Sequence, residues 1–169
     1  MLKIATDTIK ELREQSGAGI MECRNILVEV EGDIKKALQL LKERSLLKVE
    51  KRKDRVASQG LVEAYIHAGG RIGALVEVNC ETDFVARTEE FKKLAHYLAM
   101  QVAAMLPKFI SADEAPEGAE IEAQADCLLL QPFIKDPAIT VQNLINETIA
   151  RTGENIKVSR FVRFELGEP

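Results

Sequence analysis

The chain has 169 residues, of which 46% are hydrophobic and 30% are charged, and its net charge is -4. This length allows one domain, or one domain with a small satellite. The composition excludes general disorder, because apolar residues recur in nearly every segment and can form a core. No run of about 18 apolar residues is present, which excludes a membrane helix. The net negative charge argues against a general nucleic-acid binder.

The three cysteines, Cys23, Cys80 and Cys127, are odd in number and far apart in the sequence. Such a set fits neither a disulfide framework nor a C-x-x-C metal site. The N-terminus has an early acid, Asp7, and no continuous apolar block, so no secretory signal is visible. We therefore expect a cytoplasmic protein with reduced thiols, no metal and no cofactor.

The first fifty residues predict a small bundle of three helices. Thr6 is the expected cap of the first helix, which ends at Gly17. A second helix is expected from Ile20 to Val30. Gly32 ends this helix, and Asp33 caps the third helix. The third helix carries an apolar stripe at helical spacing, formed by Ile34, Ala37, Leu38 and Leu41. A bundle of this size has a thin core, and such a module is usually an interaction surface.

A charged segment at residues 48–55 follows the bundle. We expect residues 1–50 to form one domain, residues 51–57 a linker, and residues 58–169 an α+β core. The charged segment fits a solvated helix end or linker, and it also fits a phosphate-binding patch. No aromatic residue lies among the charges, so bases have no stacking platform, and we favour the linker.

Beyond the linker, the apolar period changes to two. Alternation on both sides of Gly69 and Gly70 predicts an antiparallel hairpin. Its apolar positions are Val62, Ala64 and Ile66, then Ile72, Ala74, Val76 and Val78. A third alternating segment lies near the C-terminus, and its apolar positions share one parity, at Ile156, Val158, Val162, Phe164 and Leu166. We expect these residues to form one apolar side of a three-stranded sheet, which needs a cover.

Two helices are expected to provide this cover. One spans Thr88–Leu106 and ends before Pro107, and the other spans Pro137–Thr152 and ends at Gly153. The acidic stretch between them, residues 111–126, contains no Lys or Arg and is expected to run from a loop into a helix near Ile121. The order of elements predicts an α+β fold, in which a three-helix bundle precedes a three-stranded antiparallel sheet covered by helices.

The search for catalytic residues favours a binding protein over an enzyme. The sequence has no H-E-x-x-H motif, no G-x-S-x-G motif and no glycine-rich phosphate loop. Cys80 and His67 would make a nucleophile and a base, but a cysteine at a strand end more often packs as a small hydrophobe. His96 is expected at the boundary of its helix. An aromatic content of 5% leaves little to line a small-molecule pocket.

One segment, Cys80–Arg87, allows two interpretations. Phe84 would pack under the following helix while Thr82 or Asp83 caps that helix. Alternatively, Asp83 and Phe84 form an exposed wedge of an acid and an aromatic that anchors a protein partner. Spacing alone favours the packing interpretation.

Five motifs resemble the bacterial elongation factor Ts family. Residues 12–23, LREQSGAGIMEC, resemble its N-terminal motif, and residues 76–85, VEVNCETDFV, resemble its second motif. Residues 131–137, 153–156 and 160–165 are similar to its C-terminal half. The matches run in order over nearly the whole chain, and two of them are long and specific.

This resemblance implies a guanine-nucleotide exchange factor, not an enzyme in its own right, for elongation factor Tu. It implies binding to the GDP-bound partner, disturbance of the partner's Mg²⁺ and nucleotide site, and GDP release during translation elongation. The N-terminal module is then a ubiquitin-associated-like domain that docks through Arg13, Ile20 and Met21, with His67 as a further docking residue. The residues placed near the partner's nucleotide and Mg²⁺ are Thr82, Asp83, Phe84 and Val85.

The chain departs from the longer members of the family, which have two sheet subdomains and a coiled-coil insertion. Residues 65–73 resemble the second subdomain and residues 82–85 resemble the first, so both are merged in one sheet here. This merger implies a homodimer that binds two partner molecules. A protein-binding adaptor with a ubiquitin-associated-like module is the main alternative, and an RNA-associated factor using residues 48–55 is a third. We expect no direct contact with nucleic acid and none with a membrane.

Overall fold

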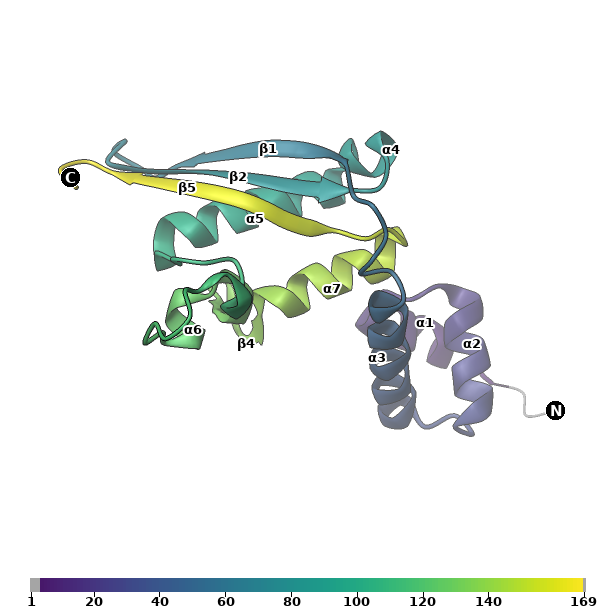
Figure 1. Cartoon of the computed structure of the whole chain (residues 1–169). Coiled ribbons are helices and arrows are strands. Elements are labelled where there is room, and N and C mark those ends of the chain that lie inside the picture. Colours follow the sequence, from purple (N-terminus) through teal and green to yellow (C-terminus); the bar gives the residue numbers. More distant parts are fainter. Residues whose placement is uncertain (1–3, 169) are drawn as a thin grey trace. The chain divides into compact units, whose positions relative to one another are not determined.

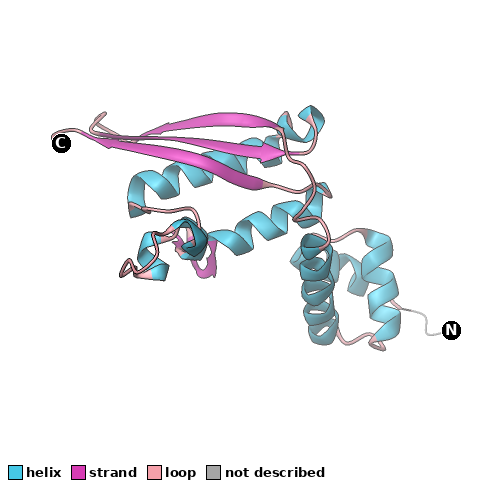
Figure 2. Cartoon of the chain, in the orientation of Figure 1, coloured by secondary structure: helices cyan, strands magenta, loops and turns pink. Residues whose placement is uncertain are grey.

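The structure is a computed structural model that describes residues 4–168, and it consists of two compact units, Met1–Lys51 and Arg52–Pro169. The α+β class predicted from the sequence is confirmed, because helices precede a three-stranded antiparallel sheet that carries further helices (Figures 1 and 2). None of the helices in the described part of the chain is long and apolar enough to cross a membrane.

The first unit contains three helices, α1 (Thr6–Ser16), α2 (Ile20–Glu29) and α3 (Ile34–Glu50). Their core is small and consists of the buried side chains of Leu12, Cys23, Ile26, Leu27, Ala37 and Leu41. Asp33 caps α3 as predicted, since its carboxylate accepts a hydrogen bond from the Lys36 N–H. The prediction that Thr6 caps α1 is wrong, because Thr6 is the first residue of the helix. Ala5 takes the N-cap position, without a side-chain hydrogen bond.

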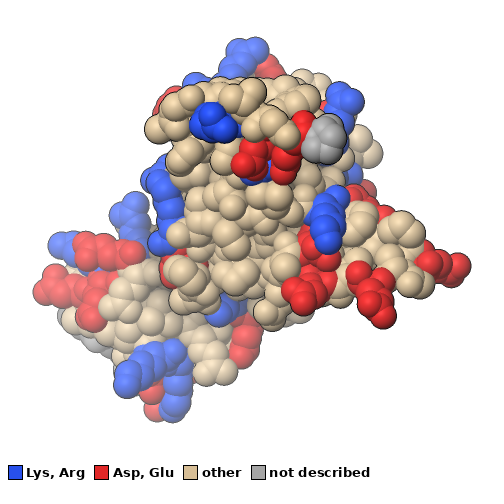
Figure 3. Space-filling model, turned by 90° about the vertical axis from the view of Figure 1, so that its left-hand side faces the viewer, with Lys and Arg blue, Asp and Glu red and all other residues tan. Residues whose placement is uncertain are grey.

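The charged segment is partly helical. Helix α3 continues to Glu50, so Lys48 lies on its last turn, where it forms an ion pair with Glu22 of α2. The face of the molecule in Figure 3 shows Lys and Arg side chains interspersed with Asp and Glu, without a continuous basic surface. The ion pair of Lys48 with Glu22 fits a solvated helix end better than a phosphate-binding patch.

The second unit is built on the strands β1 (Gln59–Ile66), β2 (Ile72–Cys80) and β5 (Lys157–Glu165). They pair in the order β1-β2-β5, and both pairs are antiparallel. Helix α5 (Glu89–Met105) packs against all three strands, and α7 (Val141–Thr152) packs against α5. Figure 1 shows both helices on the same side of the sheet. We call the helix-covered side the inner face and the opposite side the outer face.

The apolar positions predicted for β1 lie on the outer face, so their expected burial is wrong. Val62 and Ile66 are 62% and 66% exposed. Residues directly opposite each other on paired strands share a face. Val62 lies opposite Glu77, and Ile66 lies opposite Gly73, whereas the buried positions of β2 are Ala74, Val76, Val78 and Cys80. The register therefore turns the apolar residues of β1 away from α5.

Strand β5 changes face part-way along its length. Val158 lies opposite Val78, but Arg160 lies opposite Glu77, so Ser159 is an extra residue in β5. A bulge of one residue inverts the side-chain parity beyond it. Val158 is buried, whereas Val162 and Phe164 are 41% and 67% exposed on the outer face. The predicted single apolar side of this strand is therefore wrong.

The connection between α5 and α7 contains a small sheet that the sequence pattern does not predict. Strand β4 (Asp136–Thr140) pairs with β3 (Pro132–Phe133), so α7 begins at Val141 and not at Pro137. The helix expected near Ile121 is α6 (Ala123–Asp126), a single turn. Two 3-10 turns, at Ala112–Glu114 and Leu128–Leu130, complete the connection.

Two fully buried amides attach this connection to α5. The side-chain nitrogen of Gln101 donates to the Gln131 side-chain oxygen and to the Pro132 carbonyl, each at 3.1 Å. The Gln101 oxygen accepts the Ile134 N–H at 3.0 Å. The Gln131 nitrogen donates to the backbone carbonyls of Met105, the last residue of α5, and of Ala125 in α6. Buried amides with complete partners hold this irregular segment in one position.

Candidate functional site

The segment from Thr82 to Val85 forms a corner between strand β2 and helix α5. Its centre is α4 (Asp83–Ala86), a helix of four residues. Thr82 caps this helix, since its hydroxyl accepts the Val85 N–H at 3.4 Å. Phe84 is 78% exposed, so it does not pack under α5. The packing interpretation of Phe84 is therefore wrong.

The carboxylate of Asp83 at the corner forms a surface ion pair. The Asp83 carboxylate lies 2.8 Å from the Arg87 guanidinium one helical turn later. Pairs of this kind in water contribute only about 0.3–0.5 kcal/mol. Asp83 can therefore leave Arg87 for a partner at little cost, while buried Ala86 anchors α4 below it.

Cys80 ends β2 next to the corner but is not available as a nucleophile. Its side chain is fully buried, and the thiol donates to the Thr82 carbonyl at 3.1 Å. Burial, with the negative charge of Glu154 nearby, raises the pKa of Cys80 to about 11. The thiolate is the reactive form of cysteine, so this thiol is inert near neutral pH. The structure agrees with the packing interpretation of Cys80.

His67 lies at the opposite end of the sheet from the corner. It follows β1 at the hairpin turn, is exposed, and contacts the Tyr65 hydroxyl through Nδ1 at 3.1 Å. Figure 1 shows α4 at one end of the strands and the hairpin turn at the other. The nine residues of β2 separate these two ends by roughly 26–30 Å at about 3.3 Å per residue. One copy of the chain does not bring His67 and Phe84 together.

The three predicted docking residues of the first unit cluster around one helix junction. Ile20 and Met21 are 53% and 60% exposed at the start of α2. Arg13 is exposed on the last turn of α1, and Gly17 ends that helix in the left-handed conformation with φ 67°. Exposed apolar side chains at the start of α2 and an exposed cation on the last turn of α1 are suited to a protein contact.

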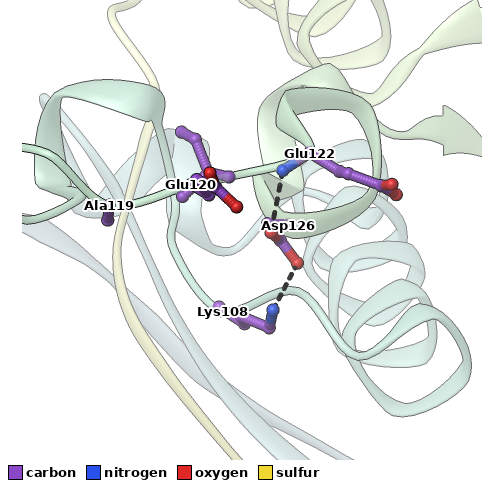
Figure 4. Close-up of a pocket in the computed structure, with 6 residues that line it drawn as sticks. Lys108, Ala119, Glu120, Glu122 and Asp126 are labelled. Carbon is purple, nitrogen blue, oxygen red and sulfur yellow. Dashed lines mark hydrogen bonds and ion pairs between the residues drawn. The ribbon is translucent and has the colours of Figure 1, made fainter.

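An acidic hollow lies beside α6, away from the predicted site residues. Lys108 contacts Asp126 at 2.9 Å, and the second oxygen of Asp126 accepts the Glu122 N–H at 3.1 Å. The hydrogen bond from Lys108 lowers the pKa of Asp126. Figure 4 shows that the Glu122 side chain points away from this pair. No group of three or more His, Cys, Asp or Glu suited to a metal occurs among residues 4–168.

Comparison with known proteins explains why these motifs occur together. The sequence model of the family described as elongation factor TS matches residues 2–125. The chain belongs to the elongation factor Ts family. It is 47% identical to elongation factor Ts of Thermoanaerobacter sp. (strain X514), in an alignment that covers 98% of this chain and 96% of that protein. It is 48% identical to elongation factor Ts of Moorella thermoacetica, with the same two coverages.

Family membership gives this chain a role in translation elongation. The elongation factor Ts of Heliobacterium modesticaldum is also 48% identical, over 95% of this chain and 88% of that protein. The alignment with the Thermoanaerobacter protein runs over 195 positions, more than the 169 residues of this chain. That relative therefore contains residues without a counterpart here.

Besides the β3–β4 sheet, two features of the second unit were not predicted from the sequence. One is the apolar outer face, which the register and the bulge create. The other is Glu154, which contacts the backbone of the corner. The sequence signal for Glu154 is its place in the family motif at residues 153–156, from which no role for Glu154 was predicted.

The burial of the cysteines predicts a simple chemical result. Cys23, Cys80 and Cys127 are all fully buried, and burial raises the pKa of Cys127 as well as that of Cys80. In a thiol-reagent assay at pH 8, we expect fewer than one thiol per native chain to react within minutes, because all three side chains are buried and the raised pKa of Cys80 and Cys127 lowers their thiolate fraction further. All three should react after denaturation, which is the control. Rapid reaction of a native thiol would contradict the burial described here.

Proposed function

We propose that this chain is the guanine-nucleotide exchange factor of elongation factor Tu, and that the corner at Thr82–Val85 acts on the partner's nucleotide site. The observation that carries the proposal is the exposure of Phe84, 78%, on a capped turn within a family motif. A large aromatic in water has no folding purpose, and aromatic anchors often dominate protein interfaces. Membership of the elongation factor Ts family supports the choice of partner.

The exchange follows from differential binding. Phosphates and Mg²⁺ hold GDP tightly, so a factor must stabilise the nucleotide-free form of the partner to release it. Phe84 inserts as a wedge, and Asp83 exchanges Arg87 for polar groups around the partner's metal. Linkage requires that nucleotide and factor weaken each other's binding equally, so incoming GTP releases the factor. The chain itself breaks no covalent bond.

Replacement of Phe84 by Ala tests the wedge. We expect stimulated GDP release from elongation factor Tu to fall roughly 30-fold, because loss of an aromatic anchor costs about 2 kcal/mol or more of binding. The free energy of unfolding should change by less than about 0.5 kcal/mol, since the ring is exposed. Fluorescent GDP release and a denaturant titration measure the two quantities.

Leu130→Ala is the matched control for Phe84→Ala. Leu130 is 41% exposed in the same unit but lies outside the corner, so its truncation should leave exchange unchanged. Normal exchange by Phe84→Ala, or an equal loss in both variants, would refute the wedge.

The first unit supplies a second contact in this proposal, through Arg13, Ile20 and Met21. It adds affinity, while the corner acts on the nucleotide site. We expect the double variant Ile20→Ala/Met21→Ala to bind nucleotide-free elongation factor Tu about tenfold more weakly in calorimetry, since each side chain buries apolar surface in the complex. Val28→Ala, at a 46% exposed position of α2, is the control. If the two variants bind nucleotide-free elongation factor Tu with equal affinity, the proposed docking role of Ile20 and Met21 is refuted.

The outer face supports a homodimer as the working form. The cross-strand rows nearest the hairpin turn are Ala64–Leu75–Val162 and Ile66–Gly73–Phe164, and neither row contains a charged residue. A Cβ at Gly73 would meet the Ile66 side chain at 2.8 Å, so glycine allows Ile66 to lie across the strand. Two such faces can stack without charge repulsion, and the second copy then supplies a second corner and a second His67.

A charge on the outer face tests the homodimer. Phe164→Asp should give a single species near 18.8 kDa in sedimentation equilibrium at micromolar concentration, because a carboxylate would be buried without a partner. Phe84→Asp alters another exposed ring, 78% against 67% for Phe164, that lies away from the outer face, so this control variant should stay dimeric. A wild-type chain that is monomeric and fully active would exclude the dimer as a requirement.

A further inference from the structure

The turn after α7 contacts the corner through one carboxylate. Glu154 accepts the backbone N–H groups of Glu81 and Thr82 through Oε2, at 3.1 and 3.0 Å. Its other oxygen, Oε1, accepts the Thr82 hydroxyl at 2.6 Å. All three hydrogen bonds end on the two residues that immediately precede α4.

A second set of bonds runs in the opposite direction. The Glu81 carboxylate accepts the Asn155 N–H at 2.7 Å. The Asn155 side chain is buried and donates to the backbone carbonyls of Lys53 and Arg55, at 3.0 and 2.8 Å. We call Glu81, Glu154 and Asn155 the corner clamp, since together they join three distant segments of the chain.

The corner needs such support because α4 is too short to be rigid by itself. Helices of a few residues are unstable without tertiary contacts, since nucleating a helix costs more free energy than the hydrogen bonds of one turn recover. Besides the bonds to Glu154, the side-chain interactions of this turn include the 3.4 Å cap from the Thr82 hydroxyl, the 2.8 Å bond from the Thr88 hydroxyl to the Val85 carbonyl, and the surface ion pair of Asp83. Hydrogen bonds to a charged acceptor are roughly twice as strong as those between neutral groups. Glu154 therefore provides the strongest polar anchor of the corner.

We propose that Glu154 is a positioning residue for the exchange reaction, which holds the Thr82–Val85 corner in the orientation that binds the partner. It touches neither partner nor nucleotide, and acts through Thr82. This inference rests on the function proposed above. If the corner is correctly placed in only a fraction of the molecules, the apparent affinity falls by that fraction while the bound complex reacts normally.

The test compares Glu154→Ala, Glu154→Gln and the control Glu147→Gln in full-length chains. Glu147 is an exposed carboxylate on α7 that pairs with Arg151 and does not contact the corner. GDP release is measured over a range of factor concentrations. For Glu154→Ala, we expect the half-saturating concentration to rise about tenfold and the maximal rate to change less than about twofold. Glu154→Gln keeps an acceptor for the backbone amides and should recover most of the affinity.

Amide hydrogen exchange of the free chain is a second measurement that does not need the partner. The N–H groups of Glu81 and Thr82 should exchange about tenfold faster in Glu154→Ala, while amides of β2 paired with β5 keep their protection. If the wild-type chain does not stimulate GDP release from elongation factor Tu, the proposed function fails. Hydrogen exchange then still shows whether Glu154 holds the corner. If the wild-type chain is active but Glu154→Ala has normal half-saturation, the positioning role is overturned. If Glu154→Gln loses protection throughout the sheet, Glu154 is a general stability residue and the inference is likewise overturned.

Discussion

The extra residue Ser159 in β5, opposite the Glu77–Val78 step of β2, determines how the second unit uses its sheet. Before the bulge, Val158 contributes to the core under α5. Beyond it, Val162 and Phe164 lie on the outer face with Leu75 of β2. The same strand therefore stabilises the fold at one end and provides an apolar surface at the other. The helix-covered face and the proposed dimer face both depend on this single irregularity.

Local signals in the sequence predicted the elements well and their faces poorly. Asp33, Gly17 and Thr88 mark helix ends through bonds within a few residues, so their roles are visible in sequence. The face of a strand depends instead on its neighbour's register, and one bulge residue reverses it. Alternation in β1 was detected, but its apolar residues were assigned to the wrong side. The β3–β4 pair was missed because two residues of strand have no period to detect.

The candidate site was partly visible in the sequence. Spacing could not decide whether Phe84 was buried, and only the resemblance to elongation factor Ts favoured exposure. The contact between Glu154 and Thr82 joins residues 72 positions apart, so no local pattern predicts it. The distance between Phe84 and His67, at opposite ends of the hairpin, likewise depends on the folded sheet. Long-range geometry supplied what motifs alone did not.

The buried amides of Gln101 on α5 and Gln131 in the connection determine how this irregular segment is aligned. A small slide of one apolar surface over another costs little free energy, whereas the same slide breaks the hydrogen bonds of a buried amide. Gln101 and Gln131 bond to each other and to backbone groups, and only one alignment satisfies all of these bonds. The pair therefore excludes shifted dockings of the segment before β3. Without this pair, a displacement of that segment would also shift α7 and the turn that carries Glu154, which lie further along the chain.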